Sequence, residues 1–249
     1  MAEPERAPLG VGALIGDTLA LARRSWRPIL LATYPPLVAL YAISTLLFPL
    51  SGDGAVFSAA EIPMTAFDYL TALPVFALAT LIADARFRGA PLVWGPYLAR
   101  VALASGPLIL MGAGFYLLVI AALLALIVPG FYAIGVFTLL VPVFLLEGHG
   151  WRSPARSFRL AAGYFWPLAG AVALILVISI LAVLLMLLPF FLGLFGGYIA
   201  IDNVNSVLLS ALSDAIYGVF LSCFGIVLHA RLVWLKEGGE GDALADVFQ

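Results

Sequence analysis

The chain has few charged residues, and this shortage decides its class. Charged residues make up 10% of its 249 residues and hydrophobic residues 64%, whereas soluble domains are about a quarter charged and about half apolar. Folding removes only about 70–75% of a chain's surface from water at this size. A soluble fold would therefore leave much apolar surface in water. The composition excludes a soluble protein and predicts an integral membrane protein, with lipid as the solvent of that surface.

Cysteine, histidine and catalytic motifs are also scarce. Cys223 is the only cysteine, which excludes an internal disulfide, and its apolar surroundings predict a buried, inert thiol. His149 and His229 have no partners at metal-ligand spacing. The glycine-rich stretch at residues 10–16 follows no strand, so it is not a phosphate loop, and no serine sits in a nucleophile elbow. We expect no enzyme, no catalytic residue, no metal and no cofactor.

Long apolar runs are what the chain has instead. They are continuous rather than alternating, which favours helices over strands, and a membrane span needs about 20 such residues. We predict an all-α, polytopic fold: one membrane domain over residues 1–235 and a flexible, acidic cytoplasmic tail at 236–249. The six predicted spans cover residues 29–48, 68–85, 101–128, 131–146, 167–198 and 207–230.

Prolines predict irregularities inside this helical pattern. Pro35 and Pro36 predict a kink in the first span, and Pro74 an interruption of the second. The pair Pro129–Gly130 predicts the turn between the third and fourth spans. A break of the fifth span is expected near Pro189 or the glycines at 193–197.

The basic residues all lie on one side of this six-span arrangement. Eleven arginines and one lysine fall before the first span, after the last, or in the loops between spans two and three and between spans four and five. The opposite loops carry Asp53, Glu61 and Asp202. The positive-inside rule then predicts that both termini are cytoplasmic. The preference for arginine over lysine is typical of a high-GC bacterial gene. The acidic start lacks an apolar signal region, so no cleaved signal peptide is expected. We predict a multi-pass protein of the bacterial inner membrane.

Three segments with arginines and aromatic residues precede odd-numbered spans. They cover residues 14–30, 92–110 and 151–170, and each predicts a cytoplasmic, interfacial amphipathic helix. Three copies of one unit, an interfacial helix followed by a transmembrane hairpin, would explain them. Convergence would also explain them, because every cytoplasmic loop needs arginine and interfacial aromatics. Both interpretations stay open.

The third segment concentrates three arginines. Arg152, Arg156 and Arg159 have the spacing of one helical face. Each basic residue near anionic lipid contributes roughly 1 kcal/mol, so we predict contact with lipid phosphates; the alternative is that these residues only fix topology and helix depth. Anionic lipids are the expected partners, with no nucleic acid. The predicted interfacial residues are Arg23, Arg24, Arg27, Arg152, Arg156, Arg159 and Trp166.

Asp214 is the one carboxylate predicted deep inside a span. Ser206, Ser210, Ser213 and Tyr217 share its helical stripe, and no basic residue is expected at that depth. An intramembrane carboxylate invites a functional hypothesis, here a proton- or solute-handling site. A polar contact between helices is the alternative.

Two further carboxylates are expected near the membrane boundary. Asp84 lies two residues from Arg86 and predicts a weak surface ion pair. Glu147 ends the fourth span, where Arg152 or another arginine of the same loop is its expected partner.

Residues 128–170 carry a family pattern: a Pro-Gly turn, a span ending in Pro-Val and Glu-Gly, an Arg-Ser segment, a glycine, and an aromatic–Trp pair. Here these are Pro129–Gly130, Pro142–Val143, Glu147–Gly148, Arg156–Ser157, Gly163 and Phe165–Trp166. The pattern resembles bacterial six-span proteins related to the membrane domain of glycerophosphoryl diester phosphodiesterases and to YciC-like inner-membrane proteins. The C-terminal "HARLVWLKEG" departs from that family, keeping only Arg231 and Glu237–Gly238.

The resemblance implies a membrane fold and a link to lipid or envelope biology. It does not imply phosphodiester hydrolysis, because the family's fused catalytic domain has no counterpart in this sequence. We therefore expect a non-enzymatic protein of lipid or envelope homeostasis, acting through anionic headgroups or by organising partners. The alternative is a carrier of a small amphipathic solute that uses the stripe around Asp214 and the proline-interrupted helices.

Overall fold

A computed structural model describes residues 9–48, 61–125, 127–191 and 203–237, and over these ranges it contains helices and no strand. Six of the helices are long and apolar enough to cross a membrane, which confirms the all-α, multi-pass prediction. The elements are α1 (Val11–Leu47), α2 (Glu61–Phe87), α3 (Trp94–Ala125), α4 (Ile127–Pro142), the π-helical turn η1 (Val143–Glu147), the 3-10 turn η2 (Gly150–Arg152), α5 (Ser153–Ala161), α6 (Phe165–Phe191) and α7 (Asn203–Glu237).

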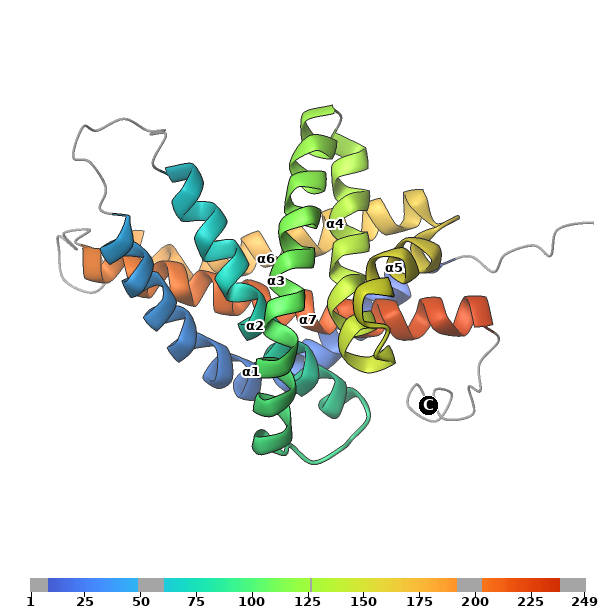
Figure 1. Ribbon diagram of the computed structural model, residues 1–249, viewed down its shortest axis with the longest axis horizontal. Helices are drawn as coiled ribbons and strands as arrows, with labels where there is room; N and C mark the ends of the chain where they lie inside the picture. The colour runs from blue at the N-terminus through green and yellow to red at the C-terminus, as the bar shows by residue number, and fades with distance from the viewer. Residues whose placement is uncertain (1–8, 49–60, 126, 192–202, 238–249) are drawn as a thin grey trace, which may run out of the picture.

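The C-terminal helix α7 is the centre of the bundle. It packs against α1, α2, α4 and α6, while α3 and α4 lie side by side as a hairpin (Figure 1). Arg231 of α7 contacts Asp17 near the start of α1, and Asp214 of α7 contacts Tyr41 near its end. The two contacts show that α1 and α7 are antiparallel.

Close helix packing around α4 depends on glycine. A Cβ at Gly135 would lie 2.7 Å from Cγ of Leu168 on α6, and Leu168 is fully buried. A Cβ at Gly225 of α7 would lie 3.1 Å from the carbonyl oxygen of Thr138. Small residues at such positions let helix backbones approach in membranes, where van der Waals packing drives association.

The predicted turn at Pro129–Gly130 is wrong. Helix α3 ends at Ala125 and α4 begins at Ile127, so both residues lie in the first turn of α4. The first four N–H groups of a helix have no intrahelical partner, and proline loses nothing by lacking one there. The pair Pro129–Gly130, which is typical of a turn, is therefore also compatible with the first turn of a helix.

The predicted interruption at Pro74 is also wrong. Helix α2 is continuous from Glu61 to Phe87. Helix α1 also continues through Pro35 and Pro36, and the kink predicted there stays a prediction. Neighbouring helices and local backbone adjustment make such prolines tolerable in membranes. Helix α6 includes Pro189, and the predicted break among residues 193–197 lies outside the described residues.

Only the third predicted interfacial segment forms a separate helix. Residues 14–30 are part of the 37-residue α1, and residues 94–110 are part of the 32-residue α3. Residues 153–161 form α5, which is joined to α6 by a turn. The three segments therefore differ in structure, and the threefold repeat stays a prediction.

Candidate functional site

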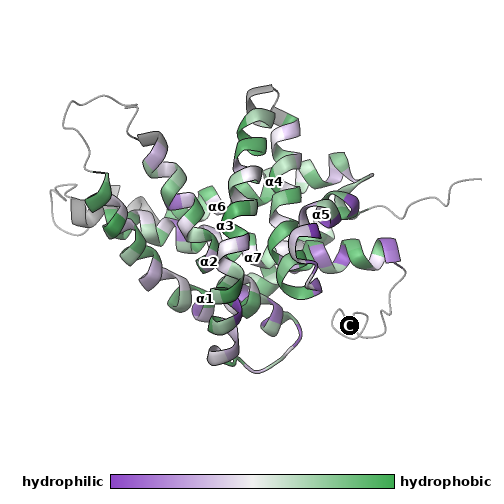
Figure 2. Cartoon of the chain, viewed as in Figure 1, coloured by the Kyte–Doolittle hydropathy of each residue, from purple (hydrophilic) through white to green (hydrophobic). Residues whose placement is uncertain are grey.

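The arginine-bearing segments converge at one end of the bundle, which we call the arginine end. Arg231 at the end of α7 pairs with Asp17 at the start of α1, with 3.1 Å between Nε and Oδ2. Arg100 at the start of α3 donates to the carbonyl of Leu145 at the end of the α4 hairpin. Figure 2 shows hydrophilic residues gathered on α5 and the C-terminal part of α7.

Glu147 is the hub of the polar contacts at this end. Its Oε2 accepts a hydrogen bond from Nε of Arg156 at 2.8 Å and lies 3.2 Å from Nδ1 of His149. Its Oε1 lies 2.7 Å from Nε2 of His229 on α7. The predicted loop-arginine partner of Glu147 is therefore Arg156, while the contact with His229 was not predicted.

Arg156 joins this hub to the end of α7. Its guanidinium lies 2.5 Å from a carboxylate oxygen of Glu237 as well as bonding Glu147. These hydrogen bonds, the one that Arg156 donates to Glu237 first, raise the pKa of Arg156 further above its usual range, so the guanidinium stays charged. With 17% of its side chain exposed, Arg156 ties α5 to α7.

The sequence predicted that the three loop arginines share one helical face, but in the structure their environments differ. Arg152 precedes α5, in the turn η2, and is exposed. Arg159 is exposed on α5, while Arg156 turns towards the two carboxylates. The difference arises because Ser153, Ser157 and Leu160 form the buried side of α5 and Arg156 flanks it.

The remaining predicted interfacial residues are all exposed. Trp166 at the start of α6 is 72% exposed. Arg23, Arg24 and Arg27 follow one another on the exposed surface of α1, and the guanidinium of Arg27 lies 5.2 Å from the ring centroid of Trp26. Asp84, in contrast to the prediction, pairs with Arg88 at 2.8 Å rather than with Arg86, because residues four apart meet on one helical face.

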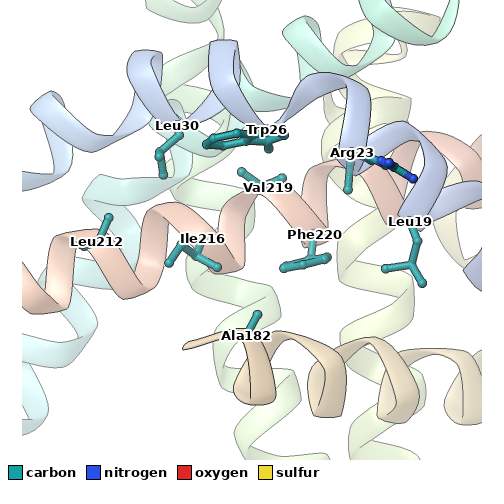
Figure 3. Close-up of a pocket in the computed structure, with 10 residues that line it drawn as sticks. Leu19, Arg23, Trp26, Leu30, Ala182, Leu212, Ile216, Val219 and Phe220 are labelled. Carbon is teal, nitrogen blue, oxygen red and sulfur yellow. The ribbon is translucent and has the colours of Figure 1, made fainter. Parts of the chain in front are cut away.

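An apolar groove of about 510 Å³ runs between α1, α6 and α7 (Figure 3). Of the described residues that line it, Arg23 alone is charged, and it lies towards one end, beside Leu19. Leu30 and Leu212 lie at the other end. The full lining is Leu19, Ala22, Arg23, Trp26, Leu30, Ala182, Leu212, Ile216, Val219 and Phe220.

A second cavity, of about 330 Å³, lies at the other end of the α1–α7 pair and has both polar and apolar walls. We call it the carboxylate cavity, because Asp68 of α2 and Asp214 of α7 both line it. Tyr41 donates a hydrogen bond to Oδ2 of Asp214. The cavity is lined by Tyr41, Thr45, Met64, Thr65, Asp68, Tyr69, Val207, Ser210 and Asp214.

The predicted polar stripe is only partly in this cavity. Ser210 and Asp214 line it, whereas Ser213 donates its hydroxyl proton to the carbonyl of Leu209 at 2.9 Å. Tyr217 lies deeper along α7 and is not among the lining residues. The side chain of Ser206 lies outside the described set.

The sequence missed Tyr41 and Asp68 as site residues. The sequence predicts Asp68 at the boundary of the second span, but α2 begins at Glu61, which places Asp68 two turns inside the helix. Tyr41 and Thr45 are four apart on α1, so they share a face. Two polar residues on one face of an apolar helix are the sequence signal that could have indicated a polar site at this end of α1.

No group of three or more histidine, cysteine or carboxylate side chains that could hold a metal occurs within the described ranges. Cys223 is buried and free. Comparison with known proteins found no matching family model, no matching curated protein and no matching solved structure. The family resemblance of residues 128–170 therefore stays a prediction, and what the helices support is a multi-pass membrane protein.

Proposed function

We propose that this protein binds an anionic phospholipid in the groove between α1, α6 and α7, as a non-enzymatic component of lipid or envelope homeostasis in a bacterial inner membrane. One observation supports this proposal above the others: Arg23 lies towards one end of a groove whose other walls are apolar. An acyl chain fits the apolar walls, and a phosphate fits the guanidinium.

Lipid selectivity in such a groove comes from the headgroup rather than from the acyl chain. A chain that leaves the bilayer for the groove exchanges one apolar environment for another, so its transfer free energy is small. Each basic residue near an anionic headgroup contributes roughly 1 kcal/mol. Arg23 therefore favours an anionic over a zwitterionic lipid by roughly 1 kcal/mol, which exceeds the chain contribution.

Trp26 supports the same placement. It lines the groove between Arg23 and Leu30 (Figure 3), and it is 46% exposed. Tryptophan favours the headgroup level of a bilayer, so Trp26 is expected to hold this part of α1 at that depth. Under the positive-inside rule, the arginine end then faces the cytoplasm and its anionic leaflet.

The test compares the lipids that co-purify with the protein and with an Arg23→Gln variant, by mass spectrometry after mild extraction. We expect phosphatidylglycerol enrichment over phosphatidylethanolamine in the wild type and an enrichment about fivefold lower in the variant, because one basic contact of roughly 1 kcal/mol is lost. Arg159→Gln is the matched control, since Arg159 is exposed at the same end but does not line the groove. Equal enrichment in all three proteins would refute the proposal.

A carrier of a small amphipathic solute is the second candidate function. The observation that favours it is the carboxylate cavity, which lies within the apolar bundle and is large enough for a small molecule. The continuous course of α2 through Pro74 removes one of the helix interruptions on which this alternative was first based. A role in lipid or envelope homeostasis through the organisation of partner proteins also stays a prediction.

A further inference from the structure

We propose that the carboxylate cavity binds a small organic cation through an ammonium group. This site is separate from the lipid groove and does not depend on it. Arg23 of the groove and Tyr41 of the cavity are 18 residues apart on α1, or about 27 Å along a helix at 1.5 Å per residue. The charged end of the groove is therefore distant from the cavity, although the apolar end of the groove reaches Leu212, near Asp214 on α7.

The two carboxyl groups of the cavity have no basic partner among the described residues. Asp68 and Asp214 line it together, and no lysine, arginine or histidine belongs to its described lining. Neither carboxylate takes part in a salt bridge within the described ranges, where every ion pair lies at the arginine end. A carboxylate inside a membrane bundle is costly unless a partner compensates it, and a cationic ligand would supply that compensation.

Unused hydrogen-bonding groups give independent support for a ligand. Within the described part of the chain, the one polar neighbour of Oδ1 of Asp68 is the hydroxyl of Ser44, which is fully buried and has no other partner. Buried polar atoms are almost always hydrogen-bonded. An ammonium group offers up to three N–H donors, which suit free carboxylate and hydroxyl oxygens.

The shape and chemistry of the cavity favour an organic cation over a metal ion. Its volume of about 330 Å³ far exceeds that of a bare ion and falls at the lower end of small-molecule sites. Asp68 and Asp214 have no third carboxylate, histidine or cysteine beside them among the described residues to complete a metal-binding group. The rings of Tyr41 and Tyr69 line the same space, and aromatic faces attract organic ammonium groups. Met64 and Val207 provide contacts for a short alkyl chain.

Tyr41 has a positioning role in this site. Its hydroxyl donates to Oδ2 of Asp214, which fixes the orientation of that carboxyl group. Thr45 lies one turn further along α1, where its own hydroxyl bonds the carbonyl of Tyr41 at 2.8 Å. Helix α1 thereby presents a pre-arranged wall to the cavity.

The test uses the full chain in nanodiscs of phosphatidylcholine and isothermal titration calorimetry. The probes are butylamine, which has one ammonium group, 1,4-diaminobutane, which has two, and 1,4-butanediol, which is neutral and of similar size. We expect both amines to bind at least about tenfold more tightly than the diol, because hydrogen bonds to charged groups exceed neutral ones. The changes Asp214→Asn and Asp68→Asn should each reduce amine affinity at least about tenfold.

Matched controls separate this site from general charge effects and from the lipid groove. Asp84→Asn removes the same charge from an ion pair at the arginine end, and it should leave amine affinity unchanged. Arg23→Gln, which disrupts only the groove, should also leave it unchanged, so the two proposals can fail independently. Ser210→Ala provides a second lining variant, with a smaller expected loss, should either asparagine variant fold poorly.

Three results would overturn the proposal. The first is amine binding no tighter than that of butanediol. The second is undiminished amine binding by folded Asp68→Asn and Asp214→Asn proteins. The third is an equal loss of affinity in Asp84→Asn, which would show general electrostatic attraction rather than recognition in the cavity.

Discussion

Glu147 connects three separate parts of the chain with one carboxylate. It contacts Arg156 on α5, His229 on α7 and His149 in the connecting loop, although the sequence places these residues up to 82 positions apart. Its side chain is 15% exposed, so water screens these contacts less than those of a surface pair. Glu147 is thus a stabilising contact of the arginine end.

Replacement of Glu147 by Gln should destabilise the protein. The change keeps the shape of the side chain but removes the charge that Arg156 and His229 face, and hydrogen bonds to charged groups contribute about 1.5–3 kcal/mol. We expect a lower midpoint of thermal aggregation in detergent. Asp84→Asn is the control, because the Asp84–Arg88 pair is surface-exposed and such pairs contribute about 0–1 kcal/mol. A similar small shift in both variants would contradict this role for Glu147.

The sequence predicted which kinds of residue form the sites better than it predicted which individual residues do. A loop arginine was expected beside Glu147, and an intramembrane role was expected for Asp214, because charge near an apolar span needs a partner. The sequence did not indicate His229 or Glu237 as members of the Glu147 hub, or Tyr41 and Asp68 as members of the carboxylate cavity. Those contacts depend on which helices become neighbours, and spacing along one helix does not specify that.

At the scale of elements, the helices continue through prolines and extend beyond the predicted spans. Helix α1 passes through three prolines, and α3 begins before the predicted span. A 37-residue helix is about 55 Å long at 1.5 Å per residue, whereas the hydrocarbon core is about 30 Å thick. The excess length accommodates the predicted interfacial segment of α1, including its arginines, within the same helix.

The number and order of the spans were predictable because hydrophobic length is a strong signal, while their ends were not. Hydrophobicity changes gradually where a helix extends into the headgroup region, so nothing in composition marks the start of α2 at Glu61 instead of Asp68. Pro129–Gly130 was misread for a different reason. Both a turn and a helix N-terminus accept that pair.

The contact between α4 and α6 should be sensitive to one methyl group. Gly135→Ala would place a Cβ 2.7 Å from Cγ of the fully buried Leu168, and overpacking of this kind costs about 1–3 kcal/mol. We expect reduced thermal stability in detergent. Gly170→Ala on α6 is the matched control, since its Cβ would meet nothing within 4 Å and alanine favours helix over glycine by about 1 kcal/mol. Equal stability of the two variants would show that α4 and α6 can separate freely.

At the scale of the whole molecule, charge is distributed unequally between the two ends of the bundle. Ion pairs join α1, α5, α7 and the end of α4 at the arginine end, and the carboxylate cavity lies at the other end. Under the positive-inside rule this asymmetry gives the bundle one preferred orientation.

Orientation can be measured with a membrane-impermeant maleimide. Trp151→Cys places a thiol at a 65% exposed position of the arginine end, and we expect labelling in inverted membrane vesicles but not in intact spheroplasts. The wild-type chain is the control, because its only cysteine, Cys223, is fully buried and should stay unlabelled on both sides. Labelling of Trp151→Cys from the outside would reverse the proposed topology.

The pairing of α1 with α7 has a consequence for how the chain is made. Helix α7 emerges from the ribosome about 190 residues after the start of α1, a delay on the order of 10–40 s at about 5–20 residues per second. During that interval α1 is already in the membrane without its antiparallel neighbour, with Tyr41 lacking Asp214 and Asp17 lacking Arg231. In a nascent chain stalled before α7, the face of α1 that packs against α7 therefore has no partner. We expect membrane chaperones and quality-control proteases to recognise this face.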